Sequence, residues 1–474
     1  MNRAAMKRAV WVLASLVGLT CMAGCAGSTD TSPPRESEAA QSEQSPPNIV
    51  LILSDDHNWN DHGFMGNELV QTPRLDALAA QSMLYTRAYN TASVCRPSIA
   101  SMVTSLYPHE NLITGNDPPG GSATQRDPAA RAAMADIFAR NTNFIEMLRD
   151  AGYATFQTGK WWEGNPTEHG FTAGMTHGDP TRGGRHGDDG LAIGREGIQQ
   201  VRDFIDSAGA QPFFLWYAPI MPHRPHNPPE RLLTKYQELL RNSPDDPYFA
   251  EQQAVYYAMI EWFDETIGEV LDHLDETGLA ENTVVIYLAD NGWISPSEPA
   301  QGANDTRSKL SYYDAGFRTP FMIRWPGRVT PGRDTTSLVS SLDLAPTVLR
   351  AAGLIPLPAM RGFDVVSERS MVQERQHVFM ELNAHTAMDL QRPLENLIAR
   401  SVTRKDGWRL IVPYLPNQDV ALTIGGTRPW WLTLDTQLYN VWDDPFETRN
   451  LAAQRPEVVQ DLLEELDRWY PVSE

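Results

Sequence analysis

Four groups of polar side chains directly follow apolar segments that have the composition of buried strands. In chain order the groups are Ser54-Asp55-Asp56, Gly159-Lys160-Trp161-Trp162, Pro219-Ile220-Met221-Pro222-His223 and Asp290-Asn291-Gly292. Open parallel sheets bind their ligands beyond the carboxyl ends of the strands. We therefore expect carboxylates, an amide, a lysine and an imidazole to converge at one edge of a sheet.

The oxygen-bearing members of these groups are suited to a metal ion. Asp55, Asp56, Asp290 and Asn291 offer the hard ligands that Ca²⁺ or Mg²⁺ prefers. A single aspartate after a strand is usually a solvated loop residue, whereas two sites that each carry adjacent Asp or Asn residues form a more specific pattern. The sequence contains no His-x-x-x-His or Cys-x-x-Cys pattern that would indicate zinc.

Cys95 stands alone in the part of the chain expected to fold. The other two cysteines, Cys21 and Cys25, lie near the N-terminus, so the folded part cannot form an internal disulfide. Pro97 fits the first position of a helix, which places Cys95 just before a helix N-terminus, where an anion is favoured. Because a thiol suits a hard metal cluster poorly, the functional group at position 95 is predicted to differ from the translated cysteine.

The segments that position these residues predict an α/β fold with a large, mostly parallel central sheet flanked by helices. Continuously apolar, strand-like runs cover residues 48–53, 153–158, 212–218 and 282–289. Thr72 and Pro73 provide an N-cap and a first helical residue for a helix over 73–84. A second helix over 251–274 carries an apolar stripe that is assigned to the core.

The pattern changes after about residue 366, where shorter strands and one terminal helix are predicted. Strands are expected at 377–382 and on both sides of a turn at 405–407, followed by a helix over 456–469. We therefore predict a catalytic domain over 47–365 and a smaller C-terminal domain over 366–474, with an antiparallel sheet and a terminal helix.

The N-terminus has the features of an export signal. A basic start, a short apolar run and the small residues before Cys25 predict a lipoprotein-type signal peptide over 1–24, with Cys25 as the lipidated N-terminus. The alternative is an ordinary secretory peptide with Cys25 incidental. Residues 25–46 predict a flexible tether. The expected location is the bacterial periplasm or the outer membrane and cell surface, with membrane attachment only through the lipid anchor.

The formal net charge of −21 argues against nucleic acids and anionic surfaces as partners. An anionic substrate would therefore need a local positive site. The glycine-rich segment over 164–194 is rich in His, Arg and Asp and lacks periodicity, so it is expected to line such a site.

Taken in order, several blocks resemble the type I, formylglycine-dependent sulfatases of the alkaline phosphatase superfamily, over nearly all of residues 47–455. The blocks are P-P-N-I-V-L-I-L-S-D-D, T-P-R-L-D-A-L-A, C-R-P-S, T-G-K-W, P-H-R-P, D-N-G, S-K-L-S-Y-Y-D-A-G-F-R-T-P-F-M-I-R-W-P-G, S-L-D-L-A-P-T-V-L and Q-L-Y-N-V-W-D-D-P-F-E-T-R-N-L. No single block is decisive, but their order and spacing are specific.

This resemblance implies a sulfuric ester hydrolase. Cys95 would be oxidised by a formylglycine-generating enzyme to 3-oxoalanine (formylglycine), whose hydrate attacks sulfur. One Ca²⁺ per chain would be bound by the modified residue together with Asp55, Asp56, Asp290 and Asn291. The metal would acidify the hydrate and neutralise sulfate charge.

The resemblance also implies that Lys160, His223 and Lys309 hold the sulfate and protonate the leaving alcohol. Imidazole is the better proton donor near neutral pH, and lysine the better fixed charge. From the residues alone, His223 between prolines could equally be a turn residue, and Lys309 a solvated loop charge.

Two positions depart from the family pattern, since Ile99 replaces an arginine in C-x-P-S-R and Trp162 replaces a histidine in G-K-W-H. Three outcomes remain open. Other groups compensate and contact the substrate, the candidates being Arg182, Arg185, His186 and Arg318. The site has shifted to a phosphodiester or phosphonate ester. Or the domain binds sulfated glycans without catalysis. We predict an active sulfatase of a variant subgroup.

The predicted substrate is a sulfated small molecule or glycan, with a sulfated polysaccharide or oligosaccharide preferred. Tryptophans near the predicted strand ends provide rings on which sugars could stack: Trp161, Trp162, Trp216 and Trp293. The same residues could instead pack in the core or at the rim.

Overall fold

The computed structural model describes residues 45–243, 247–293, 307–414, 416 and 432–472. All of them belong to one compact unit, Ser45–Glu474. The predicted signal peptide and most of the predicted tether lie outside the described residues.

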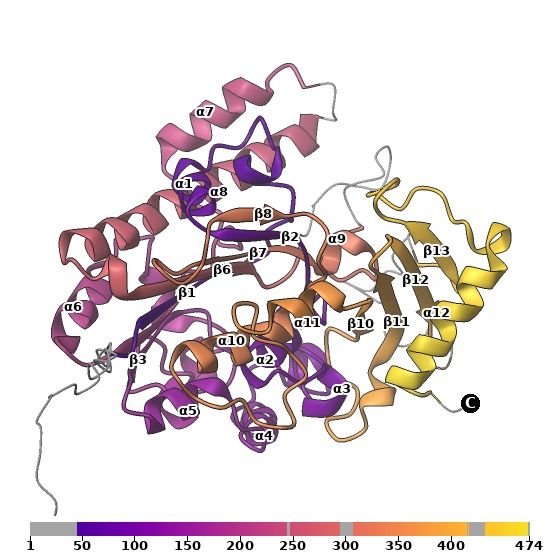
Figure 1. Ribbon diagram of the computed structural model, residues 1–474, viewed down its shortest axis with the longest axis horizontal. Helices are drawn as coiled ribbons and strands as arrows, with labels where there is room; N and C mark the ends of the chain where they lie inside the picture. Colours follow the sequence, from indigo (N-terminus) through magenta and orange to yellow (C-terminus); the bar gives the residue numbers. More distant parts are fainter. Residues whose placement is uncertain (1–44, 244–246, 294–306, 415, 417–431, 473–474) are drawn as a thin grey trace, which may run out of the picture. The chain divides into compact units, whose positions relative to one another are not determined.

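A mixed sheet forms the centre of the described chain, with the strand order β4-β3-β5-β1-β6-β7-β2-β8 and β9 paired to β2 (Figure 1). Its strands are β1 (Asn48–Ser54), β2 (Met83–Tyr89), β3 (Ala154–Gly159), β4 (Ala173–Gly174), β5 (Phe213–Ala218), β6 (Thr283–Ala289), β7 (Arg318–Arg324), β8 (Gly332–Asp334) and β9 (Val339–Ser340). The pairs β3–β5, β5–β1 and β1–β6 are parallel, whereas β7 runs antiparallel to β6 and β2. The predicted fold class is confirmed.

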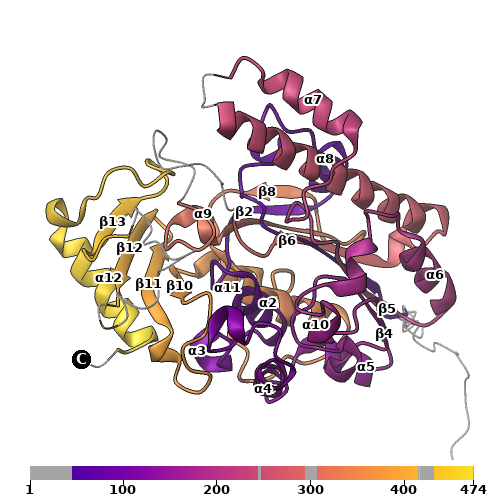
Figure 2. The ribbon, with the colours of Figure 1, turned by 180° about the vertical axis from the view of Figure 1, so that it is seen from behind.

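Helices cover both faces of this sheet (Figures 1 and 2). The helices are α1 (Pro73–Ala80), α2 (Cys95–Thr104), α3 (Pro108–Asn111), α4 (Pro128–Phe138), α5 (Phe144–Asp150), α6 (Gln199–Ala208), α7 (Glu230–Leu240), α8 (Pro247–Glu276), α9 (Asp314–Phe317), α10 (Leu344–Ala351), α11 (Arg369–Glu374) and α12 (Pro456–Trp469). Alternate residues of β1 face opposite sides. Leu51 packs with α2, α5 and α10, and Ile52 packs with α1, α6 and α8. Because both faces are covered, β1 is buried along its whole length.

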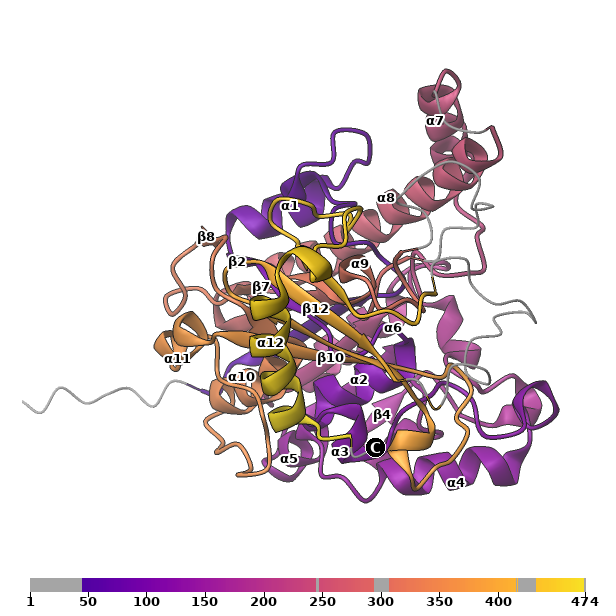
Figure 3. The same cartoon turned by 90° about the vertical axis from the view of Figure 1, so that its right-hand side faces the viewer.

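A second, antiparallel sheet lies toward the C-terminus (Figure 3). It consists of β10 (His377–Asn383), β11 (Leu397–Arg404), β12 (Trp408–Pro413) and β13 (Gln437–Asn440). One face packs on α12 through Leu462 and Leu466. The other face packs on Tyr312, Tyr313 and Phe317, which precede β7. The second sheet therefore adjoins the segment that carries Lys309.

Two sequence predictions need correction. The helix predicted over 73–84 ends at Ala80, because Met83 and Leu84 begin β2, a strand that the sequence analysis missed. Thr72 occupies the N-cap position, but its hydroxyl makes no capping hydrogen bond; it donates to the carboxylate of Asp76 instead. The strand β7 was also missed.

The helix after the cysteine begins two residues earlier than predicted. Cys95 is itself the first residue of α2, Val94 is the N-cap, and Pro97 lies in the first turn. Ile99, Met102 and Val103 are buried along this helix, and Leu106 lies beyond its end.

The predicted domain boundary near residue 365 stays a prediction. Within the described residues, no helix is long and apolar enough to cross a membrane.

Candidate functional site

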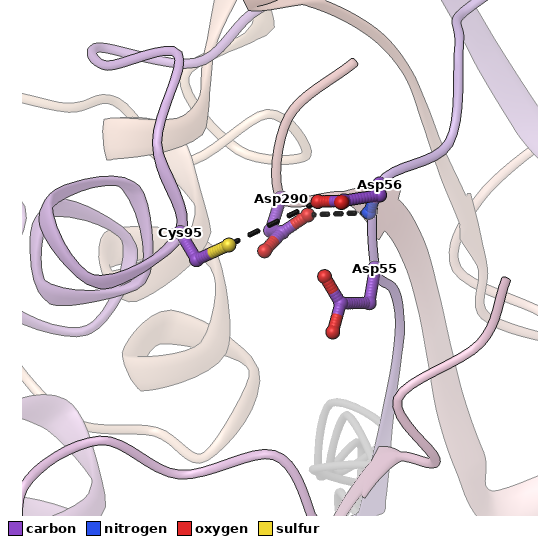
Figure 4. Close-up of side chains that lie close together, drawn as sticks. All are labelled: Asp55, Asp56, Cys95 and Asp290. Atoms are coloured by element: carbon purple, nitrogen blue, oxygen red, sulfur yellow. Dashed lines mark hydrogen bonds between the residues drawn. The ribbon is translucent and has the colours of Figure 1, made fainter. Parts of the chain in front are cut away.

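Four ionisable side chains gather beyond the carboxyl ends of β1 and β6. Asp55 and Asp56 follow β1, Asp290 follows β6, and Cys95 begins α2. Their ligand atoms all lie within 4.8 Å of one another (Figure 4). The convergence predicted from the strand ends is therefore present in the fold.

The parallel pairing of β1 with β6 explains why the carboxylates meet. Ser54 pairs with Ala289 at the last position of the ladder, so the residues that follow both strands are neighbours. The Asp56 amide donates to Asp290 Oδ1 (3.1 Å), and the Asp290 amide donates to the Ser54 carbonyl (3.0 Å). The Ser98 hydroxyl of α2 donates to the Asp290 carbonyl (2.6 Å), which joins the helix start to the same point.

Two buried lysines lie among these carboxylates. Lys160 Nζ donates to Asp55 Oδ1 (2.5 Å) and Asp290 Oδ2 (2.8 Å). Lys309 Nζ pairs with Asp56 and lies 2.9 Å from Cys95 Sγ. Lys160 is fully buried, and Lys309 is 8% exposed. Both predicted lysines are thus in the cluster, one between two carboxylates and the other beside the cysteine.

Burial and charge act in opposite directions on these groups. Burial raises the pKa of Asp55 to about 6, despite the nearby Lys160. Burial also opposes ionisation of Asp56, but the Lys309 ammonium, with His223 and Lys160, holds its pKa well below the usual value. Burial raises the pKa of the Cys95 thiol to about 12, so the unmodified side chain is uncharged at neutral pH.

The donor set of the cluster fits a hard cation. The buried oxygens Asp55 Oδ2 and Asn291 Oδ1 have no hydrogen-bond partner among the described residues. Such buried oxygens are costly to leave without a partner. Asn291 Nδ2 donates to Asp56 Oδ1 (2.8 Å), which orients the amide. Three carboxylates also exceed the two ammonium groups by one negative charge. A divalent cation would coordinate the free oxygens and leave the cluster with one positive charge, which suits an anionic ligand.

His223 lies on the more open side of the cluster. Its Nδ1 lies 2.8 Å from the Arg224 carbonyl and donates to it, so Nε2 is the atom that faces Asp56 Oδ2 at 3.8 Å. The imidazole is 25% exposed, in contrast to the buried lysines. Burial lowers its pKa to about 4, although the Asp56 carboxylate partly offsets this.

The glycine-rich segment brings two of its three predicted residues to the site. The His186 ring lies 5.7 Å from that of His223 and stacks on Trp162 at 4.9 Å. Arg185 also lies over the Trp162 ring, with Cζ 4.8 Å from the ring centroid. Arg182 is exposed at the end of a 3₁₀ helix, Pro180–Arg182. It makes no hydrogen bond or ion pair with the side chains of Trp162, His186 or His223 in the described structure.

The arginine positions around Cys95 do not restore the family pattern. Ile99 is 3% exposed and belongs to the apolar core beneath the sheet. Arg96 points to Glu163, to which Nε (2.8 Å) and Nη2 (2.7 Å) donate. Arg318 contacts the Trp59 ring (3.7 Å) and the Thr86 carbonyl. Among the described residues, therefore, no guanidinium contacts the Cys95 sulfur.

Of the two alternatives for the four tryptophans, packing in the core or at the rim agrees with their burial, since none of them is more than 7% exposed. Trp161 and Trp216 are 2% and 0% exposed and pack edge-to-face in the core. Trp293 stacks on Tyr256 at 3.8 Å. Trp162 stacks on His186, whose ring lies 5.7 Å from that of His223.

The sequence analysis missed a polar wall next to Trp162. Asp117 accepts hydrogen bonds from Arg185 and Arg131, and His385 Nδ1 lies 3.6 Å from Asp117 Oδ2. His385 follows β10, and the neighbouring Thr386 forms an isolated bridge with Asp117. No motif flags this meeting, because the two segments are far apart in the sequence and only the tertiary fold joins them.

Comparisons with known proteins agree with this arrangement. A family model described as "Sulfatase" matches residues 47–354, and one described as "N-sulphoglucosamine sulphohydrolase, C-terminal" matches residues 304–411. The first match alone covers more than half of the chain.

Individual relatives and one solved structure give a similar result. The chain is 29% identical to human N-acetylgalactosamine-6-sulfatase over 356 residues, covering 67% of this chain and 64% of the human protein. It is 26% identical to N-acetylgalactosamine-6-O-sulfatase of Bacteroides thetaiotaomicron, covering 98% and 99% of the two chains. The chain thus spans just under two thirds of the mammalian relatives but almost all of the bacterial one. The crystal structure of Ps i-CgsB has a TM-score of 0.67 at 21% identity, over 90% of this chain and 92% of that one, which shows a shared fold.

Proposed function

The chain belongs to the sulfatase family, and on that premise we propose that it hydrolyses sulfate esters, releasing inorganic sulfate from a sulfated carbohydrate. One observation carries the proposal. Cys95, three carboxylates and two ammonium groups meet beyond the carboxyl ends of parallel strands, with an accessible imidazole beside them. A fixed charge cluster with a proton donor on its open side suits the cleavage of an anionic ester.

Cys95 is proposed to be matured to formylglycine by a formylglycine-generating enzyme. Hydrated formylglycine supplies a hydroxyl nucleophile where the thiol of Cys95 stands. What supports this is the position of the side chain, at the first residue of α2 and 2.9 Å from Lys309 Nζ. The ammonium group stabilises negative charge on whatever group occupies position 95.

One Ca²⁺ per chain is proposed to be held by Asp55, Asp56, Asp290 and Asn291 together with the residue at position 95. When bound there, the ion would supply Lewis-acid chemistry, neutralising sulfate charge and favouring ionisation of a nearby hydroxyl. The two buried oxygens without partners support its presence.

The chain's own residues then divide the work. Lys309 stands beside Cys95 and holds positive charge at the point of attack. Lys160 links Asp55 to Asp290 and keeps the two carboxylates in place for the cation and the sulfate. His223 presents Nε2 on the exposed side, facing Asp56. In the neutral ring the proton is on Nδ1, so Nε2 first takes up a proton, which the Asp56 carboxylate favours. The imidazolium then delivers this proton to the leaving alcohol oxygen.

The names of two relatives support the proposed substrate class. Human N-acetylgalactosamine-6-sulfatase and N-acetylgalactosamine-6-O-sulfatase of Bacteroides thetaiotaomicron are named for a sulfated sugar, and this chain belongs to the sulfatase family. We propose a sulfated glycan as the substrate of this chain. Export through the predicted signal peptide and attachment through lipidated Cys25 remain proposals from the sequence.

Sulfate release tests this function. The protein is incubated with sulfated mono- and oligosaccharides and with matched phosphate and phosphonate esters, and the released anion is measured by ion chromatography. A higher kcat/KM on sulfate esters is expected, with no turnover by the Cys95→Ala variant. Preference for phosphorus esters, or no turnover on any ester, would contradict the proposal.

A further inference from the structure

A second polar cluster lies beside the reactive one. It consists of Asp117, Arg131, Trp162, Arg185 and His186, which we call the arginine wall. Its residues come from three separate parts of the chain, namely the segment before α4 together with α4, the segment after β3, and the glycine-rich segment. None of these residues contacts the Cys95 sulfur, so the reactive cluster does not account for the arrangement.

Arg185 is held firmly at one edge of its guanidinium. Nε donates to Asp117 Oδ1 and Nη2 donates to Asp117 Oδ2, each at 2.8 Å. One face of the guanidinium lies near the Trp162 ring, which restricts its rotation further. A fork–fork pair of this kind is geometrically specific. The side chain is therefore preorganised before any ligand arrives.

The opposite edge of the same guanidinium remains available. Nη1 has one near contact among the described residues, His186 Nδ1 at 3.5 Å, which is a long and weak one. The Arg185 side chain is 21% exposed. An arginine has five donors, and Asp117 engages two of the three nitrogens. Arg185 therefore retains donors that a ligand can accept.

This available edge lies on the side of the reaction centre. His186, which contacts Nη1, has its ring 5.7 Å from that of His223, and His223 in turn faces Asp56. The Trp161 amide also donates to the His186 carbonyl (3.1 Å), which binds the loop to the segment that follows Lys160. The His186 ring therefore connects Arg185 to His223, the proposed proton donor.

The arginine wall also carries a charge surplus. Asp117 is the carboxylate that pairs with both Arg131 and Arg185, so the three groups sum to one positive charge. The chain as a whole has a net charge of −21. A partly exposed cationic group at this point favours an anion there and steers it towards the site.

We propose that Arg185 binds a second anionic group of the substrate, so that the preferred substrate carries another sulfate ester or a carboxylate near the sulfate that is cleaved. This inference rests on the proposed function and specifies its substrate class. The anion accepts from Nη1 of Arg185, while Asp117 positions the guanidinium and Trp162 supports its face. Arg185 is thus a specificity-determining residue.

Binding to the Cys95→Ala protein in the presence of Ca²⁺ tests the proposal without turnover, by isothermal titration calorimetry. One pair of probes is N-acetylgalactosamine 4,6-disulfate and N-acetylgalactosamine 6-sulfate. The other pair is a chondroitin 6-sulfate disaccharide and its carboxyl-reduced counterpart. We expect the dianionic member of at least one pair to bind about tenfold more tightly, the size of one charge-assisted hydrogen-bonded contact. The pair that shows the preference identifies whether a sulfate or a carboxylate is recognised.

Two variants at position 185 separate recognition from loop support. Arg185→Gln should remove the preference for the dianionic probe. Its affinity for the monoanionic probe should stay within about threefold of the parent value, the size of effect expected for a surface substitution. Arg185→Lys keeps the charge without the fork, so an intermediate preference is expected. Arg241→Gln removes an equivalent charge from an exposed residue just after α7 and should leave the preference intact (α7 is labelled in Figure 1).

The possible results decide the inference separately from the function. Equal affinity for both members of both pairs, or a preference that survives in Arg185→Gln, would overturn the role of Arg185. An equal loss of affinity for all probes would also overturn it, since that result assigns Arg185 to the loop or to the first sulfate. Failure of the proposed function is seen in a different measurement, as absent sulfate release by the wild-type protein that carries formylglycine at position 95.

Discussion

The ammonium nitrogen of Lys309 lies 2.9 Å from the sulfur of Cys95. The same nitrogen pairs with Asp56, so one side chain joins the start of α2 to the end of β1. The segment that carries Lys309 also packs, through Tyr312 and Tyr313, against the second sheet. The C-terminal part of the chain therefore helps to place a charge at the reactive position.

Lys309→Met should lower kcat by about a hundredfold or more, because the charge beside position 95 is lost from a buried site. The Ca²⁺-loaded variant should remain folded, since the cation then neutralises Asp56. Steady-state kinetics and circular dichroism measure both effects. Lys235→Met removes an exposed lysine that pairs with Glu261 and serves as the control. If Lys309→Met had the same kcat as the wild-type protein, the assigned role of Lys309 would be refuted.

Metal removal should abolish activity and destabilise the fold. Without a cation, three buried carboxylates share two ammonium groups, and Asp55 Oδ2 and Asn291 Oδ1 lack partners among the described residues. Treatment with a chelator should lower Tm, and Ca²⁺ should restore both Tm and turnover. Asp290→Asn should reduce the amount of bound metal, measured by inductively coupled plasma mass spectrometry. Asp136→Asn, at an exposed position of α4, should not. Full metal content in Asp290→Asn would contradict the site.

Ile99→Arg should destabilise the protein rather than restore the family pattern. Ile99 is 3% exposed in an apolar cluster, and an unpaired guanidinium there lacks water and a partner. A loss of several kcal/mol in unfolding free energy is expected, against about 1 kcal/mol for Ile99→Val. Urea unfolding gives both values. If Ile99→Arg were as stable as the parent and more active, the site would have a place for arginine that the structure does not show.

The sequence predicted most of the reactive cluster because strand ends are local features. Runs of buried residues fixed β1, β3, β5 and β6, and in a parallel sheet their ends meet at one edge. The strand β2 was missed because its first residues extend the apolar pattern of α1. The available signal was the aromatic and β-branched content of Met83–Tyr89, which includes Tyr85, Thr86 and Tyr89.

The arginine wall could not be predicted in the same way. Asp117, Trp162 and Arg185 come from separate segments of the sequence and meet only through the fold. The direction of a side chain is also invisible in a motif. Arg96 lies next to Cys95 in the sequence, yet its guanidinium is paired with Glu163.

Asp264 should make stability depend on pH. Its buried carboxylate accepts from the Arg74 amide (2.9 Å) and the Leu75 amide (2.7 Å), and burial raises its pKa from 3.8 to about 7. The folded state binds this proton more tightly than the unfolded state. The contribution of Asp264 to stability is therefore greatest below pH 4 and falls as pH rises to about 7.

Asp264→Asn removes this titration and can still accept one amide hydrogen bond. The unfolding free energy of the variant minus that of the wild-type protein should increase by about 1–3 kcal/mol when the pH rises from 5 to 8. Urea unfolding at the two pH values measures the gain. Asp203→Asn on exposed α6 should show none. A constant difference between Asp264→Asn and the unmodified protein at both pH values would show that Asp264 does not titrate in this range.

The chemical identity of residue 95 tests the central claim most directly. Active protein purified from its native host is digested, and the peptide that contains position 95 is analysed by mass spectrometry alongside an assay of sulfate release. The account predicts an aldehyde at position 95, recognised by its lower mass and its reaction with a hydrazide, in proportion to specific activity. Full sulfate-releasing activity in protein whose Cys95 is an unmodified thiol would contradict it.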